Sequence, residues 1–425
     1  MGLLQRDRTP PRRSAVHDRA STGHPDARMR RGRVLLALAL VLTAFNLRPA
    51  ISGLGPVLAE VRDDLGMSAT VAGLLTSVPA LCFAVFGVTA PRLAGRFGAV
   101  RVVLAGLAAI ALGLGLRAVA GDTAVFLATS ALALAGIAVG NVLMPVLVKR
   151  FFADRVGLLT GLYSMGMALG TAGAAALTIP ISEAFGGHWR HGLAAWAALA
   201  ALALLFWLFV PRRARGDAER RAGDGHAAPG QRRLRLTRSP TAWALGVFFG
   251  LQATAAYVTM GWLPQIYRDA GVPASEAGML LAVVMGLGAP LSFLIPTLAT
   301  RMRHQGPLVV AIGLCGFAGY LGLWLAPAGG AWAWAVLLGI ANTAFTVALT
   351  MIGLRARTGT GVIRLSAFAQ SIGYLLSVPG PLLVGALNEA TGGWSAPLLL
   401  LGTLLTAQVC CGVLAGRDRC VEDDG

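Results

Sequence analysis

Long apolar runs follow one another from residue 34 to residue 415, and short polar stretches separate them. A helix of about 20 apolar residues crosses the hydrocarbon core of a bilayer. Apart from a closed β-barrel, only a helix satisfies all of its backbone hydrogen bonds within the bilayer. The runs therefore predict twelve membrane-spanning helices, at residues 34–58, 69–91, 100–120, 123–148, 156–182, 190–210, 241–265, 276–300, 306–326, 331–353, 362–387 and 394–415.

The composition supports a membrane protein and excludes a soluble one. Of the 425 residues, 56% are hydrophobic and only 13% are charged, whereas soluble domains carry about 25% charged residues. A polar segment rich in arginine, residues 211–239, divides the predicted helices into six and six. The predicted fold is an all-α integral membrane protein made of two six-helix halves, residues 34–210 and 240–415.

The two halves also look like parallel copies of one sequence. Short matches recur at an almost constant offset of 205 to 208 residues, in the first, second and fifth helices of each half. The matching pairs are Gly55-Pro56 with Leu263-Pro264, Ala72-Gly73-Leu74-Leu75 with Ala277-Gly278-Met279-Leu280, Leu159-Thr160 with Leu365-Ser366, and Ser164-Met165-Gly166 with Ser371-Ile372-Gly373.

The distribution of basic residues predicts the orientation. The net charge is +17, but 31 of the 36 lysines and arginines fall on one side of the predicted helices. Cytoplasmic segments carry this excess, so both termini and the 211–239 linker are expected in the cytoplasm of a bacterial inner membrane. We expect these segments to contact anionic lipids, and no nucleic acid. Residues 1–33 are predicted to be a disordered basic arm, and residues 416–425 a cytoplasmic tail.

One charge lies in the middle of the first predicted helix. Arg48 is followed by Pro49, which has no N–H to donate and biases the residue before it away from helical geometry. A charge at this depth costs about 2.5 kcal/mol or more to insert, so it normally faces a cavity or a partner. Arg48 is therefore a candidate anion-binding residue; the alternative is a structural arginine paired with helix-end carbonyls.

Two motifs link the chain to a known group of proteins: Asn46-Leu47-Arg48-Pro49-Ala50 followed by Gly55-Pro56, and Ala90-Pro91-Arg92-Leu93-Ala94 after the second helix. With them, the chain resembles the major facilitator superfamily, and within it the cyanate and nitroimidazole transporter family. Pro91 stands where the superfamily's loop signature has an aspartate. That departure argues against the usual gating ion pair of this loop.

The resemblance implies that helices 1, 4, 7 and 10 surround a central substrate cavity. The polar residues on these helices and on helix eleven then become candidate substrate-binding residues: Asn46, Arg48, Ser52, Asn141, Gln252, Tyr257, Asn342, Gln370 and Tyr374. A second polar stripe on helix five, Thr160, Ser164 and Thr171, is interpreted as packing. Arg117, near the end of the third helix, is interpreted as a surface residue that extends to the membrane boundary.

The absence of certain residue types from the predicted helices limits which functions are possible. No Asp, Glu or His lies in the middle of a predicted span, and the five cysteines lack metal-ligand spacing. We therefore expect no metal, no cofactor and no enzymatic activity, and a monomeric secondary transporter for a small anionic or polar solute. The alternative functions are a proton-coupled efflux pump for drugs or metabolites, and a sensor or scaffold; a membrane carboxylate would have favoured the pump.

The topology can be tested directly. Reporter fusions at Gly225 and at the C-terminus are expected to give cytoplasmic signals, because the basic segments that contain them should stay inside. A periplasmic signal from either fusion would overturn the orientation.

Overall fold

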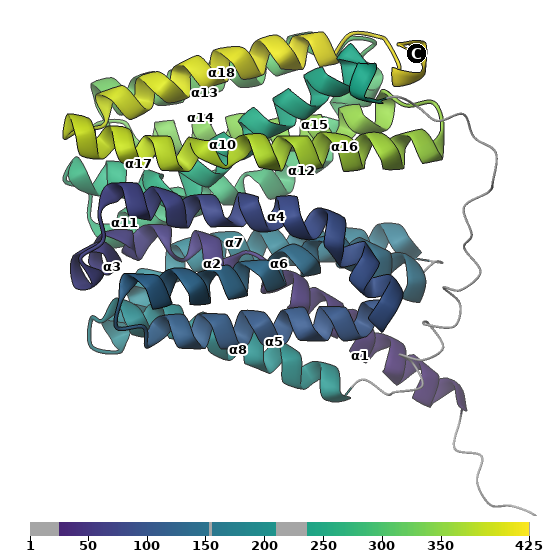
Figure 1. Cartoon of the computed structure of the whole chain (residues 1–425), viewed down its shortest axis with the longest axis horizontal. Coiled ribbons are helices and arrows are strands. Elements are labelled where there is room, and N and C mark those ends of the chain that lie inside the picture. Colours follow the sequence, from purple (N-terminus) through teal and green to yellow (C-terminus); the bar gives the residue numbers. More distant parts are fainter. Residues whose placement is uncertain (1–24, 153–154, 210–235, 425) are drawn as a thin grey trace, which may run out of the picture.

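The computed structural model describes residues 25–152, 155–209 and 236–424. In these residues the regular elements are all helical, and twelve helical segments are long and apolar enough to cross a membrane, as the sequence predicts. Figure 1 shows the two halves as two layers, with α1–α8 in the lower layer and α10–α18 in the upper. The expectations for residues 1–24 and for most of the 211–239 linker lie outside the described residues.

The first span is divided into the long helix α1 and three short elements, and the other five spans of this half are continuous helices. Helix α1 begins at Pro25, so residues 25–33, expected in the disordered arm, extend the first helix. The elements are α1 (Pro25–Phe45), α2 (Pro49–Ser52), η1 (Gly55–Val57), α3 (Leu58–Leu65), α4 (Ala69–Phe97), α5 (Ala99–Ala118), α6 (Thr123–Phe151), α7 (Val156–Ala184) and α8 (Trp189–Phe209).

Three spans of the second half are each divided into two helices. Pro290 and Pro381 cannot donate to the carbonyls four residues before them, which explains the breaks at Leu287 and Val378. The break at Thr343 contains no proline. The elements are η3 (Leu236–Arg238), α10 (Pro240–Asp269), α11 (Ala274–Gly286), α12 (Gly288–Arg301), α13 (Gly306–Leu325), α14 (Ala331–Asn342), α15 (Ala344–Leu354), α16 (Gly359–Ser377), α17 (Pro379–Thr391), α18 (Ser395–Ala415) and η4 (Val421–Asp423).

Polar bonds join the two halves at one end of the bundle. We call the end where α1 begins and α18 stops the terminal end, on the right of Figure 1, and the opposite end the far end. At the far end Arg268 of α10 forms an ion pair of 2.8 Å with Glu60 of α3. The Glu389 carboxylate of α17 accepts from the Thr70 amide of α4 at 2.8 Å and from its hydroxyl at 2.7 Å. Among the described residues, the hydrogen bonds between the halves all lie here.

Glycines bring the backbones of the two halves into contact in the same region. A side chain at Gly55 would collide with the carbonyl oxygen of Met260, and a Cβ at Gly278 would lie 2.6 Å from the carbonyl oxygen of Ala175. Small residues allow such close approach, and dispersion forces then act over a large area. The far end is therefore closed by both packing and ion pairing.

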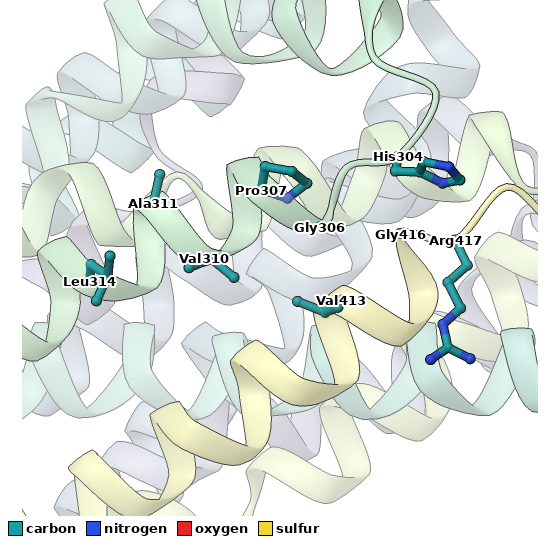
Figure 2. Close-up of a pocket in the computed structure, with 9 residues that line it drawn as sticks. All are labelled: His304, Gly306, Pro307, Val310, Ala311, Leu314, Val413, Gly416 and Arg417. Carbon is teal, nitrogen blue, oxygen red and sulfur yellow. The ribbon is translucent and has the colours of Figure 1, made fainter.

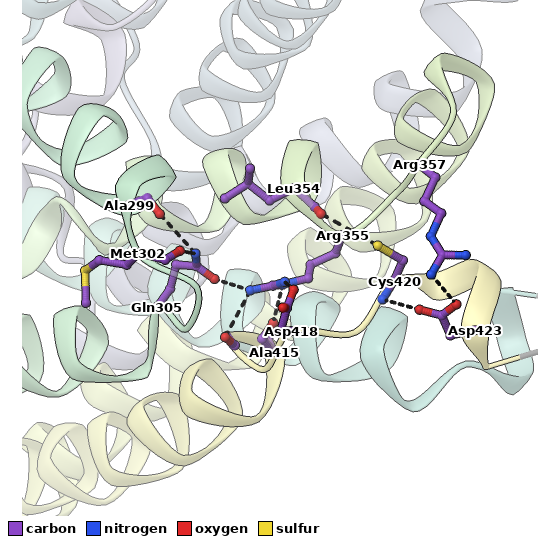
Figure 3. Close-up of polar contacts among 11 residues, drawn as sticks. Ala299, Met302, Gln305, Leu354, Arg355, Arg357, Ala415, Asp418, Cys420 and Asp423 are labelled. Atoms are coloured by element: carbon purple, nitrogen blue, oxygen red, sulfur yellow. Dashed lines mark hydrogen bonds and ion pairs between the residues drawn. The ribbon is translucent and has the colours of Figure 1, made fainter.

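At the terminal end, a buried arginine holds the C-terminal segment against the bundle (Figure 3). Arg355, only 2% exposed, donates to the carbonyl oxygens of Ala415 and Gly416 at 3.1 and 3.0 Å and to the side chain of Gln305. Gln305 in turn donates to the carbonyl oxygen of Met302 at 2.8 Å. Burial lowers the pKa of the Arg355 guanidinium, and Asp418 opposes this shift.

This network predicts that Arg355 stabilises the fold. Arg355→Ala leaves the amide oxygen of Gln305 and the carbonyl of Ala415 without a partner, whereas the Gly416 carbonyl still accepts from the backbone amide of Gln305. We expect a loss of about 3 kcal/mol in the free energy of unfolding. The matched control is Arg357→Ala, because the Arg357 side chain is 64% exposed and pairs with Asp423 at the surface. We expect that control to change stability by about 0–1 kcal/mol. Equal melting temperatures of the two variants in detergent would contradict the assignment.

Candidate functional site

The break in the first span presents Arg48 at the middle of the bundle. Helix α1 ends at Phe45, and Arg48 is the N-cap of α2 with φ −132°, so the predicted interruption before Pro49 is confirmed. The Arg48 carbonyl accepts from the amides of Ile51 and Ser52 at 3.0 and 3.1 Å. It also accepts from the Ser52 hydroxyl at 3.2 Å. These bonds fix the backbone of Arg48 and leave its side chain free to extend.

A central cavity of about 550 Å³ lies between the two halves, and the Arg48 side chain lines it. The rest of the wall comes from α7, α10, α11, α12, α14, α15 and α16 and from the break at Thr343. Met165 on α7 and Phe293 on α12 line the cavity toward the terminal end and are 50% and 69% exposed. Since the far end is closed, the cavity opens toward the terminal end.

Arg48 is the only charged residue among the described residues of this wall. In the part of the chain that the structure describes, its side chain forms no hydrogen bond and no ion pair. Tyr257 and Tyr374 line the same cavity as the Arg48 guanidinium. Bonds from the guanidinium to helix-end carbonyls, which the structural alternative required, are absent among these described residues.

Aromatic rings cover one side of the cavity. Tyr374 of α16 stacks on Phe83 of α4 with ring centroids 4.9 Å apart and planes at 20°. Tyr374 also meets Phe249 of α10 edge to face at 5.1 Å, and Phe249 contacts Phe345 of α15 at 5.6 Å. Tyr374 therefore contacts both halves while it faces the cavity. A planar ligand would find an aromatic surface beside the positive charge.

Four of the nine predicted substrate-binding residues line the cavity, namely Arg48, Tyr257, Asn342 and Tyr374. The other five lie outside the described wall and bond to protein groups. Asn46, Asn141 and Ser52 bond to carbonyls of their own helices, Gln370 bonds to Ser366, and Gln252 bonds to Asn342 and Gln408.

Some wall residues were judged to be packing groups or were missed. Thr160, Ser164 and Thr171 of α7 line the cavity, although their stripe was interpreted as packing. Ser292 and Thr346 were not singled out, yet they also line it. Both belong to spans that are divided in the second half. The helical spacing showed that the α7 stripe avoids lipid, but only the packing of the two halves decides whether it meets a helix or a cavity.

A separate groove lies on the outer surface, between α13 and α18 (Figure 2). It has a volume of about 570 Å³ and is lined mainly by apolar residues such as Val310, Leu314 and Val413, with His304 and Arg417 at its terminal end. Leu314 is well exposed on a membrane-spanning helix. This groove therefore faces lipid and is separate from the central cavity.

Two six-helix halves around a central cavity that is closed at one end form the architecture of a secondary transporter. Sequence comparison agrees, since the family model of the Major Facilitator Superfamily matches residues 34–378. The chain belongs to this superfamily, whose members are transporters rather than enzymes.

Two relatives and one solved structure show the extent of the similarity. A 2-nitroimidazole transporter of Escherichia coli is 33% identical over 92% of this chain and 97% of its own. The cyanate transport protein CynX of the same organism is 30% identical over 84% and 91%. The crystal structure of a D-xylose-proton symporter has a TM-score of 0.69 at 14% identity, covering 90% of this chain and 96% of that chain. At that identity the structure supports the fold alone.

The position of Gln252 predicts a structural effect. Its side-chain amide donates to the carbonyl and side-chain oxygens of Asn342, both at 3.1 Å, and accepts from Gln408 at 3.1 Å. Gln252→Leu leaves buried polar groups unpaired, so we expect it to lower the free energy of unfolding by about 1–3 kcal/mol. Asn141→Ala is the control, because Asn141 bonds only to Ile137 of its own helix. An unchanged melting temperature for the Gln252 variant would refute the assignment.

Proposed function

We propose that this protein moves a small anionic or polar solute across the bacterial inner membrane by alternating access, with Arg48 as the residue that grips the solute. The observation that carries the proposal is the unpaired guanidinium in the wall of the central cavity. A charge in a low-dielectric interior is costly without a counter-charge, and a bound anion supplies one. The cavity volume of about 550 Å³ lies within the usual range for small-molecule sites.

The chemistry of the guanidinium narrows the solute class. Its planar fork can donate two parallel hydrogen bonds to a carboxylate, a nitro group or adjacent ring nitrogens. Tyr374, beside it, offers a ring face to a flat heterocycle. The names of the two relatives, which refer to a nitroimidazole and to cyanate, fall in the same range. A cyanate-like anion, a weak acid or a nitroimidazole-like heterocycle is the proposed solute.

The proposal includes an orientation and a conformational cycle. The excess of basic residues assigns the terminal end to the cytoplasm, so the cavity of this structure would be open inward. Release of the Glu60–Arg268 ion pair and of the Glu389 bonds to Thr70 would then open the far end to the outside. A single chain contains the complete cavity, which agrees with a monomer that contacts anionic lipids at its cytoplasmic surface.

The alternative of a proton-coupled drug pump lacks a group for the proton in this wall. The described residues that line the cavity include no Asp, Glu or His. A pump for cationic compounds would place a carboxylate where this protein places Arg48. The wall therefore favours solutes that accept hydrogen bonds from a cation.

Substitution of Arg48 tests the proposal. Arg48→Ala is expected to weaken solute binding by about 10- to 150-fold, the equivalent of a lost charged hydrogen-bond pair, while the protein still inserts. Arg48→Lys keeps the charge but loses the fork, and is expected to recover only part of the affinity. The measurements are binding to purified protein and uptake into proteoliposomes, with cyanate, nitrate, carboxylates and a nitroimidazole as candidate solutes.

The control is Arg101→Ala, because Arg101 is an exposed arginine of α5, a helix that contributes no residue to the cavity wall. That variant is expected to bind and transport like the unmodified protein. An Arg48→Ala protein that melts early but still binds and transports would identify Arg48 as a structural brace and refute the proposal.

A further inference from the structure

Arg117 is a second arginine inside the bundle, and its position differs from the sequence-based expectation. It was interpreted as a surface residue near a helix end, but its side chain is only 1% exposed. One guanidinium nitrogen, Nη1, donates to the Ala50 carbonyl oxygen at 3.0 Å, and the guanidinium lies 5.7 Å from the ring centroid of Phe126. The surface interpretation was therefore wrong.

Two of the three guanidinium nitrogens of Arg117 have no partner. Nε and Nη2 are fully buried and form no hydrogen bond, and the hydroxyl of Ser130 on α6 is in the same state. Ser130 is 0% exposed. Buried polar groups are nearly always bonded, so three unpaired groups on two neighbouring helices require an explanation.

The same two residues line a small cavity, the second cavity, just beyond the central one toward the far end. Its volume is about 10 Å³, enough for one water-sized particle. The remaining wall is largely apolar, with Leu54, Pro79 and Leu134 among its residues, and the hydroxyl of Thr76 is already bonded to Ala72 and Gly73. No carboxylate lines it among the described residues.

We propose that the second cavity is an occluded binding site for one small monatomic anion such as chloride, held by Nε and Nη2 of Arg117 and by the hydroxyl of Ser130. All three groups can donate a hydrogen bond, and an anion accepts from all of them. A water molecule could bond there too, but it would leave the buried positive charge uncompensated, which is costly in this environment. The small volume excludes polyatomic anions, and chloride, which is somewhat larger than water, requires the side chains of the wall to move slightly outward.

The bond from Arg117 to Ala50 connects this site with the central one. Ala50 belongs to α2, the four-residue helix that Arg48 caps. Tyr257 lies in the walls of both cavities. An anion beside Arg117 therefore sits behind the element that positions Arg48, on the opposite side from the solute.

The test measures the melting temperature of the purified full-length protein without solute, in sodium chloride and in sodium gluconate at equal ionic strength. Chloride is expected to raise the melting temperature by a saturable amount, because a ligand that binds only the folded state stabilises it. Ser130→Val, which fills the cavity and removes a donor, is expected to abolish the shift. Arg117→Met should abolish it as well.

The control variant is Arg48→Gln, which changes only the central cavity. This variant is expected to keep the full chloride shift, which would place the chloride outside the central cavity. The proposed function fails by a different result, namely unchanged solute binding in the Arg48 variants. Equal melting temperatures of the unmodified protein in the two salts would overturn the proposal and assign water to the cavity. Loss of the shift in Arg48→Gln would overturn it by assigning the anion to the central cavity.

Discussion

The electrostatic cost of a guanidinium at the centre of an apolar bundle is the constraint on which this structure depends. Pro49 interrupts the first span, and the short helix α2 resumes from Arg48. The backbone at this break is satisfied locally by bonds to the Arg48 carbonyl, as irregular backbone at membrane depth requires. The guanidinium of Arg48 faces the central cavity. In the proposed function, this unpaired guanidinium is the donor that binds and releases the solute.

The closed end of the bundle combines polar links with close backbone contacts between the two halves. Its polar links, Arg268 with Glu60 and Thr70 with Glu389, are partly exposed, and such links are individually weak. The close contacts at Gly55 and Gly278 set backbone against backbone, with no large side chain between them. Buried apolar residues of both halves also belong to one continuous core, with Leu58 from one half and Leu280 from the other among them. Within the second half, buried polar bonds such as the network around Arg355 add to the packing of the helices.

The sequence predicts features that one helix determines by itself. Span length and hydropathy specify twelve crossings, and Pro49 specifies the first break. Arg48 could be placed in a cavity because a charge at mid-span has few alternatives. Arg117 lies near a helix end, where an arginine at the surface and a buried arginine occur in the same kind of sequence, so the sequence could not tell the two positions apart. The break at Thr343, which has no proline, and the choice between cavity and packing for Thr160 depend on how helices meet, which no single helix encodes.

The stacked rings of Phe83 and Tyr374 have a mechanical consequence. They come from α4 and α16, one in each half, and meet between the closed far end and the open terminal end. If the two halves separate at one end while they close at the other, their relative displacement is smallest near the middle, where these rings meet. Two flat ring faces can slide and tilt over a short distance without losing contact, unlike interlocked branched side chains. In the proposed transport cycle, the two rings would stay in contact while the halves tilt, and Tyr374 would remain part of the cavity wall.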